Sequence, residues 1–413
     1  MAGSGELHQN SDGNWAFRVK SSNGEVVAVD GGEGYSSRPE AHAILQTLIS
    51  GGYDGPIVAP ATVTCGQEIT EDITLDANLV CPSGPALVIA ADNITVDLGG
   101  FTITGDGPGA ATGPGIVFRN VKGCTLQKGT VTGFGAGVAI NGGSNNVVQN
   151  VTMQNNVGVA GGEFGDGIVV NDSSGNHIVG NTVARNGPFS GIALVGACTA
   201  NEVRQNTVTD NNMLPGDPSA GRQAMGIRVE GPAADNNVIV GNTVTGSGAE
   251  GIVVLATCLD TSAGCAGTPP NQGNEIAENM SHRNGTSGQG NGIRLFAVPQ
   301  PVAPAHTTIT GNVTDGNVTH GIGIDAVGGA NPGPTENRVS GNSAHGNGGF
   351  DGFDGNPRPA CGSNTWEGND FGRVNQPCVS APGPTPPAPP SEPPPPSEPP
   401  PSMPPMPGMP PHH

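Results

Sequence analysis

The sequence is poor in aromatic side chains, which make up 3% of its 413 residues. Aromatic residues normally contribute the largest buried areas to a globular core, so this core must be made of other side chains. Val, Ile and Thr are abundant instead, and they favour strands over helices. The composition therefore predicts a mainly β protein with an aliphatic interior.

Positive charge is scarce as well. Lys and Arg total 15 against 35 Asp and Glu, which gives a formal net charge of −20. Such an acidic chain repels phosphate backbones, and no basic stripe with interleaved aromatics is present, so nucleic acid is excluded as a partner. No apolar run has the length of a membrane span, so we expect a soluble chain.

The eight cysteines lack the CxxC spacing of metal sites, and six of them fall into close pairs. Closing a loop of about 15 residues stabilises a fold by about 3 kcal/mol. Such pairs favour an oxidising, extracytoplasmic compartment, although MAGSGELHQN shows no signal peptide. A mature form or another export route would reconcile the two observations. The predicted disulfides are Cys65–Cys81, Cys258–Cys265 and Cys361–Cys378.

Residues 1–55 differ from the rest of the chain. WAFRVKSSNGEVVAVD reads as two strands joined at Asn23-Gly24, the strongest short hairpin signal. A helix follows, with Ser36 or Ser37 as its cap. Its apolar face holds Ala41, Ile44, Leu45 and Leu48.

This order of elements resembles the YegP-like family of small ββα domains. The resemblance implies a fold and no settled activity. One such unit buries little surface alone, so we expect it to associate with a second copy or to dock on its neighbour.

The last segment, residues 381–413, carries 18 of the 39 prolines and is predicted to be a disordered, extended polyproline II tail. Its end, MPPMPGMPPHH, offers thioether and imidazole groups that suit copper. Met and Pro repeats also arise readily in low-complexity tails, so both interpretations stay open. The candidate metal ligands are Met403, Met406, Met409, His412 and His413.

Residues 56–380 contain a repeated eleven-residue formula, as in NHIVGNTVARN at 176 and NEVRQNTVTDN at 201, with Asn at its first, sixth and eleventh positions. Ile178 and Val183 are five residues apart, which fits two short strands meeting at a corner. Asn tolerates the left-handed backbone of such a corner. A Gly-Ile element between copies, such as GIVV at 167 and GIRL at 292, supplies a third strand.

Stacked at about 4.8 Å, such coils bury columns of Val and Ile against one another. The repeat therefore predicts a right-handed parallel β-helix with three strands per coil and about nine or ten coils. A leucine-rich-repeat horseshoe is disfavoured because Leu is rare and the repeat contains no helical segment. We expect end caps at 60–104 and 350–379, where Trp366, Phe371 and disulfides would cover the exposed strands.

The run LGGFTITG at 98–105 and the segment at 350–379 resemble right-handed β-helix proteins of the NosD-like, pectate-lyase-like class. That resemblance implies the fold. The class includes lyases, hydrolases, epimerases and noncatalytic scaffolds, so it leaves the function open. FDGFDGNP at 350 is similar to the YGFDPHD motif of alginate epimerases but lacks its Tyr and His.

Alternate residues of the Gly-Ile strands should face solvent and stack into columns on one sheet. In this arrangement an Arg could hold a uronate carboxylate while a His or carboxylate moves a proton. Ordinary cross-strand ion pairs on a solvated sheet are the simpler alternative. Phe296 is the only aromatic identified in these columns, which weighs against a sugar-processing site. The candidate catalytic residues are Arg228, Glu230, Glu250, Arg294, His320 and Asp325.

We therefore expect an exported or cell-surface β-helix protein that binds glycans or serves as a structural scaffold. One alternative is a lyase, hydrolase or epimerase acting on uronate-containing polysaccharides. Another is a copper-associated periplasmic protein that uses the Met/His tail. The insertions at 258–272 and 298–306 are candidate recognition loops.

Overall fold

The chain divides into two compact units, Met1–Ala61 and Thr62–His413. A computed structural model describes residues 4–10, 13–30, 34–50, 63–109, 113–159, 164–213, 224–256, 271–297, 303–326, 333–356 and 361–380.

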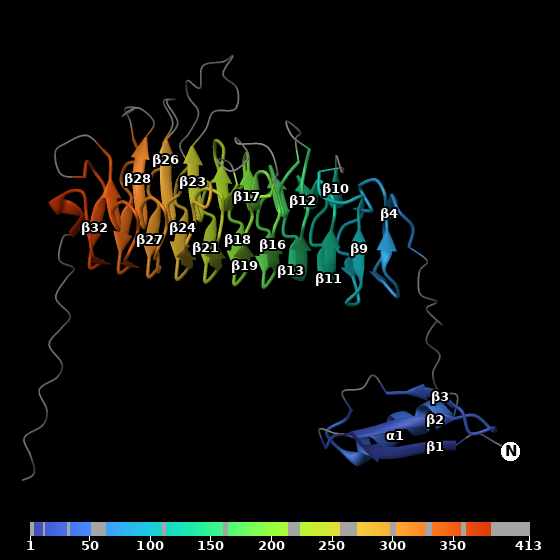
Figure 1. The fold of residues 1–413 in the computed structure, drawn as a ribbon. Helices are drawn as coiled ribbons and strands as arrows, with labels where there is room; N and C mark the ends of the chain where they lie inside the picture. The colour runs from blue at the N-terminus through green and yellow to red at the C-terminus, as the bar shows by residue number, and fades with distance from the viewer. Residues whose placement is uncertain are drawn as a thin grey trace, which may run out of the picture. The chain divides into compact units, whose positions relative to one another are not determined.

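The first unit is a three-stranded antiparallel sheet with one helix (Figure 1). Its elements are β1 (Ser4–Gln9), β2 (Trp15–Lys20), β3 (Val26–Val29) and α1 (Arg38–Ile49). β1 adds one strand to the predicted ββα order. Its sequence SGELHQ contains a single apolar side chain, Leu7, so it shows no alternation from which a strand could be predicted.

The helix α1 begins as the sequence predicts. The Ser37 hydroxyl accepts a hydrogen bond from the backbone N–H of Glu40 at 3.4 Å, which caps the first turn. Ala41 and Leu45 are the buried residues of this helix. This domain therefore has a small apolar core of its own.

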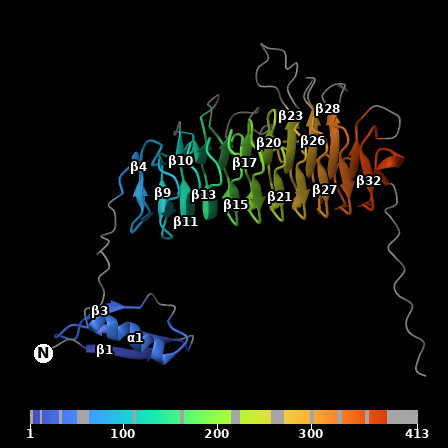
Figure 2. The ribbon, with the colours of Figure 1, turned by 180° about the vertical axis from the view of Figure 1, so that it is seen from behind.

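The second unit is a stack of coils in which every neighbouring pair of strands is parallel (Figures 1 and 2). One continuous sheet contains eleven strands. They are β4 (Gln67–Ile69), β7 (Leu87–Ile89), β10 (Pro114–Arg119), β12 (Ala136–Asn141), β14 (Ile168–Asn171), β17 (Ser190–Val195), β20 (Met225–Glu230), β23 (Ile252–Ala256), β26 (Ile293–Ala297), β28 (Ile322–Ala326) and β31 (Gly352–Asp354).

The eleven-residue formula builds the other two walls of each coil. One wall holds β5 (Ile73–Thr74), β8 (Thr95–Asp97), β11 (Thr125–Thr132), β13 (Val147–Gln154), β15 (His177–Val179), β18 (Glu202–Arg204), β21 (Val238–Val240), β24 (Glu275–Ala277), β27 (Thr308–Thr310), β29 (Arg338–Ser340) and β32 (Thr365–Glu367). The other holds β6 (Leu79–Val80), β9 (Thr102–Thr104), β16 (Thr182–Ala184), β19 (Thr207–Thr209), β22 (Thr243–Thr245), β25 (Met280–His282), β30 (Ser343–Ala344) and β33 (Asp370–Phe371). β11 and β13 are long enough to run through both walls.

The parallel β-helix with three strands per coil is confirmed. Its largest sheet has eleven strands, where the repeats predict about nine or ten coils. The difference arises at the ends, because β4, β7 and β31 lack the Gly-Ile element by which the inner coils are recognised.

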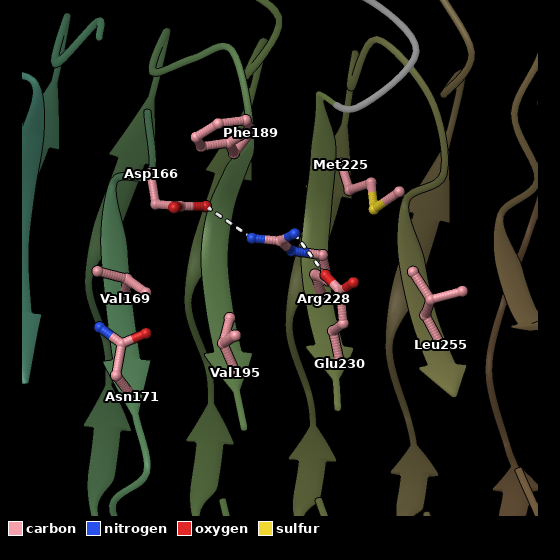
Figure 3. A pocket seen from close by; sticks show the side chains of 9 residues that line it. All are labelled: Asp166, Val169, Asn171, Phe189, Val195, Met225, Arg228, Glu230 and Leu255. Carbon is pink, nitrogen blue, oxygen red and sulfur yellow. Dashed lines mark hydrogen bonds and ion pairs between the residues drawn. The ribbon is translucent and has the colours of Figure 1, made fainter. Parts of the chain in front are cut away.

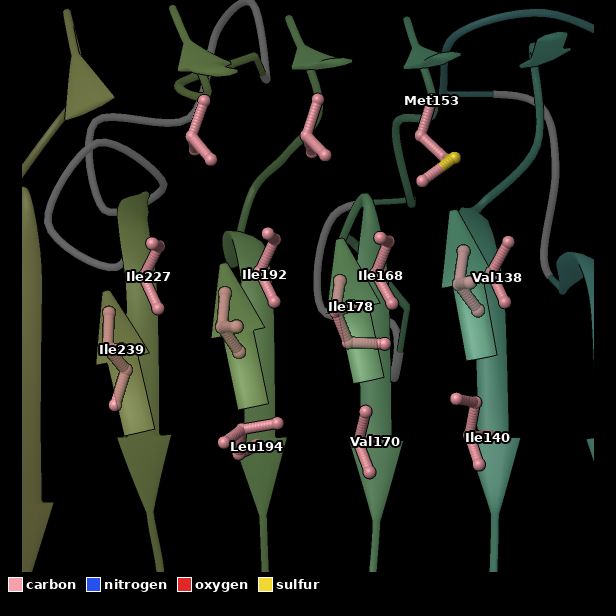
Figure 4. Close-up of a cluster of buried hydrophobic side chains, with 14 of the residues drawn as sticks. Val138, Ile140, Met153, Ile168, Val170, Ile178, Ile192, Leu194, Ile227 and Ile239 are labelled. Carbon is pink, nitrogen blue, oxygen red and sulfur yellow. The ribbon is translucent and has the colours of Figure 1, made fainter. Parts of the chain in front are cut away.

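Aliphatic side chains fill the interior in continuous columns (Figure 4). Ile168, Ile192 and Ile227 lie in register on successive strands, and all three are fully buried. Each fully buried Ile or Val side chain stabilises the fold by about 1.5–3 kcal/mol. The core therefore lies inside the coils and leaves the outer faces of the sheets available for other side chains.

Ladders of buried Asn side chains occupy the corners between strands. Asn206 Oδ1 accepts hydrogen bonds from the backbone N–H and the side chain of Asn181 at 2.9 and 3.0 Å. Its Nδ2 donates to Ile178 O and to Asn242 Oδ1. The ladder thus links one coil to the next and satisfies polar groups that no water reaches.

The left-handed backbone lies one position earlier than the sequence predicts. Gly180 and Gln205, which precede the ladder residues Asn181 and Asn206, have φ values of 64° and 55°. The turn at the preceding residue directs these two Asn side chains inward, where they bond the neighbouring coils.

Two of the three predicted disulfides are present, Cys65–Cys81 and Cys361–Cys378. Cys258 and Cys265 lie outside the described residues. At the carboxyl end of the helix, Trp366 is buried and meets Phe371 edge-on at 6.0 Å between ring centroids. Cys124 and Cys198 are unpaired and buried, and burial raises the pKa of both thiols.

Replacing a ladder residue, as in Asn206→Ala, should lower the free energy of unfolding by at least about 2 kcal/mol. The substitution leaves buried donors and acceptors of two neighbouring coils without partners. Denaturant titration of the full chain measures the change. The control is Asn141→Ala, which removes an exposed acceptor from Asn171 Nδ2 and should change stability by less than about 0.5 kcal/mol. Equal losses in both variants would contradict the ladder's role.

Candidate functional site

The outer face of the eleven-stranded sheet carries side chains in columns that run across the coils. Arg228 pairs in register with Val253, which pairs with Arg294, which pairs with Gly323. The neighbouring column contains Glu230, Leu255, Phe296 and Asp325. This is the register that the repeat predicts. Loops of unequal length between the coils do not shift it.

Arg228 is the centre of the first charged cluster (Figure 3). Its Nη1 donates to Glu230 Oε2 at 2.6 Å, and its Nη2 lies 3.6 Å from Asp166 Oδ1. The Arg228 side chain reaches two strands along the sheet, from β20 toward the start of β14. Ala193 stands between them in the column, and its small side chain leaves room for this crossing.

A pocket of about 300 Å³ surrounds this cluster. Its polar lining is Asp166, Asn171, Arg228 and Glu230, and the apolar lining is Val169, Phe189, Val195, Met225 and Leu255. The pocket therefore combines hydrogen-bonding groups with an apolar wall, as sites for small ligands commonly do.

Asp166 is the most perturbed group of this pocket. It is 4% exposed, and burial raises its pKa to about 6 against the opposing effects of Arg228 and Ser190. Within the described part of the chain, Asp166 Oδ1 and Arg228 Nε are buried atoms without a hydrogen-bond partner. The sequence places Asp166 directly before a Gly-Ile strand, but it is not among the predicted catalytic residues.

Arg294 is the centre of the second cluster. Its Nε and Nη2 donate to the two carboxylate oxygens of Asp325 at 2.8 and 2.9 Å, and its Nη1 donates to Glu250 at 2.6 Å. The guanidinium carbon lies 3.7 Å from the centroid of the Phe296 ring. Burial lowers the pKa of Arg294, but Asp325 and Glu250 outweigh that effect and raise it.

A second pocket of about 330 Å³ lies along this cluster and is lined by Glu250, Gln289, Arg294 and Phe296. Met225 and Leu255 line both pockets, so the two adjoin on the same face of the sheet. Together they form what we call the sheet-face groove, from Asp166 to Phe296.

His320 lies beyond this groove in a group of stacked rings. Its ring is nearly parallel to Phe353 at 4.2 Å between centroids, and Phe350 follows at 5.8 Å. His320 Nδ1 accepts from the Phe350 backbone N–H at 2.9 Å, and burial lowers the pKa of the imidazole. This arrangement favours the neutral ring, with its proton on Nε2.

Phe350 and Phe353 are additional aromatic groups that the sequence interpretation missed. It assigned 350–379 to an end cap and counted Phe296 as the only aromatic in the columns. β31 nevertheless continues the sheet and pairs with β28, which places Phe353 opposite Gly323. The Asp residues of FDGFDGNP have structural partners: Trp366 and Asn364 donate to Asp354.

The six predicted site residues thus fall into three groups on one face. Arg228 and Glu230 are paired, Arg294 joins Glu250 and Asp325, and His320 lies with the phenylalanines. Arg294 cannot clamp a uronate carboxylate without first losing a carboxylate that it already holds, because Nε, Nη1 and Nη2 all donate to Asp325 or Glu250. Arg228 donates a hydrogen bond to a carboxylate through Nη1 alone.

The remaining predicted sites are the copper-binding tail and the recognition loops. The Met/His tail and most of the insertion loops lie outside the described residues. Among the residues that are described, no group of three or more His, Cys, Asp or Glu side chains could hold a metal ion. No described helix is long and apolar enough to cross a membrane.

Asp166→Asn should stabilise the protein at neutral and alkaline pH. A carboxyl whose pKa rises from 3.8 to about 6 on folding loses stability as the pH rises through that window. The variant should therefore gain up to about 3 kcal/mol above pH 6 and nothing near pH 3. Denaturant titrations across pH 3–8 test this, with the exposed Asp76→Asn as control. A difference that does not vary with pH would contradict the raised pKa.

Comparison with known proteins agrees with this architecture. Residues 87–266 match the family model described as Right handed beta helix region, and residues 10–52 match Domain of unknown function (DUF1508), the YegP-like family. No curated protein matches the chain by sequence.

Similar solved structures share low sequence identity with this chain. Pectate lyase Pel9A has 16% identity and a TM-score of 0.49, covering 77% of this chain and 82% of its own. A point mutant of the periplasmic alginate epimerase AlgG has 12% identity and a TM-score of 0.49, covering 73% and 70%. A GH87 alpha-1,3-glucanase catalytic domain has 16% identity and a TM-score of 0.44, covering 77% and 62%.

The repeats, the stacked coils and the family matches lead to one conclusion. The chain contains a right-handed parallel β-helix, and its amino-terminal residues 10–52 match the DUF1508 family model.

Proposed function

We propose that this protein binds a glycan in the sheet-face groove. The observation that carries the proposal is the pair of adjoining pockets, each with a carboxylate–arginine cluster beside an apolar wall. Sugars present hydroxyl groups at their edges and C–H groups on their faces, so they require both kinds of surface. A polymer lying across successive strands would meet both pockets.

The rigidity of the scaffold supports this proposal. The groove side chains project from strands whose register is fixed on both sides, and ion pairs hold the two arginines in place. Preorganised side chains lose less conformational entropy on binding. The aromatic group at His320, Phe350 and Phe353 extends the same face beyond Arg294.

The two disulfides support an extracytoplasmic location, where a polysaccharide would be encountered. A second candidate function, cleavage of the bound glycan, is favoured by Asp166. Its raised pKa of about 6 suits a proton donor near neutral pH. One glycan panel can test both binding and cleavage.

The test is a panel of neutral, cationic and uronate-rich glycans, read for bound protein and for new reducing or unsaturated ends. Arg228→Ala should weaken binding about tenfold or more because it removes the group that holds Glu230 beside Asp166. The control is Arg204→Ala on β18, which breaks a comparable pair with Glu202 on another sheet and should leave binding unchanged. Failure of every glycan to bind would overturn the proposal.

A further inference from the structure

We infer that the Asp166 end of the sheet-face groove is a subsite for a sugar that carries a free amino group, and that the groove disfavours uronates. This inference rests on the proposed glycan-binding function and names the chemical class of the ligand. Its basis is the balance of charge, the pairing of the arginines and the unpartnered acceptor.

The balance of charge in the groove is negative. Its described carboxylates are Asp166, Glu230 and Glu250, with Asp325 beside them, against the two arginines Arg228 and Arg294. Four acidic groups against two basic groups leave an excess of two. The whole chain is also acidic, at −20. A polyanion is repelled by this field, and a cation is attracted to it.

Both arginines are already engaged by protein carboxylates. Asp325 takes two donors of Arg294 and Glu250 takes a third, while Glu230 holds Nη1 of Arg228. At Arg294 a uronate would have to displace one of these carboxylates and leave it without its partner. Breaking a desolvated ion pair by removing one partner is destabilising, so this exchange is unfavourable.

The acceptors at the first cluster are incompletely satisfied. Arg228 Nη2 lies 3.6 Å from Asp166 Oδ1, which is longer than a hydrogen bond, so this buried oxygen has no full partner. An ammonium group has three donors and no acceptor, so it matches a site rich in acceptors. It would also offset the desolvation of the buried carboxylate.

Neighbouring side chains provide the rest of the subsite. Phe189, Met225 and Leu255 form an apolar wall for the sugar ring, and the unpartnered Nε–H of Arg228 can donate to a ring substituent oxygen. The charged groups facing Asp166 are Arg228 and Glu230, both from β20.

Calorimetry with oligosaccharides of one backbone provides the test. Glucosamine oligomers with free amines should bind at least tenfold more tightly than their N-acetylated counterparts at pH 7. Oligogalacturonates of equal length should bind more weakly than both. Because Asp166 must be ionised to hold the ammonium, the preference for free amines should fall about tenfold per pH unit below the Asp166 pKa of about 6.

Isosteric variants separate the subsite from general attraction between a cationic ligand and an acidic protein. Asp166→Asn should abolish the preference for free amines over N-acetylated oligomers. Asp76→Asn removes the same charge from an exposed position and should retain the preference. Thermal unfolding of each variant confirms that it is folded.

Three results would overturn the inference: equal affinity for free and acetylated amines, tightest binding by the uronate, or retention of the preference in Asp166→Asn. In each case, continued binding of acetylated oligomers leaves the proposed glycan-binding function intact. Absence of binding by any glycan would remove the proposed function and the inference together.

Discussion

The hydrogen-bonded alignment of each coil with the next is the constraint on which this structure depends. A single coil cannot bury its aliphatic side chains alone, and its corners contain backbone N–H groups that water does not reach. The Asn ladders meet both requirements, because each amide accepts from one coil and donates to its neighbours. Once the ladder fixes the corners, the strands between them have only one register.

The same constraint determines which side chains meet on the outside. Asp166 and Arg228 are 62 residues apart in the sequence, but their strands lie two coils apart in the stack. Insertions between coils change this separation in sequence without changing it in space. Charged side chains on the outer face can therefore form clusters without any cost to the core, which is built entirely by the inward-facing residues.

Much of this could be predicted from the sequence, because the repeat determines both the inward-facing residues and the columns outside. The ends of the stack could not be predicted as well: β31 carries GFD in place of a Gly-Ile element, so Phe353 was not recognised as part of the sheet face. The pairing of Arg294 with two carboxylates was also hidden. A long side chain can reach several partners. Which of them it binds depends on distances and burial that the sequence alone does not give.

The distance between the two arginine clusters is set by the number of coils between them. Arg228 and Arg294 stand two strands apart, and parallel strands are spaced about 4.8 Å. Their separation can change only in steps of one strand spacing, by gain or loss of a coil between β20 and β26. Asp166 and Asp325, which contact the two arginines, lie outside that interval. Duplication of a coil inside it would therefore leave these ion pairs in place. Length and chemistry can thus vary almost independently in this scaffold, which lets one architecture be matched to polymers with different repeat distances.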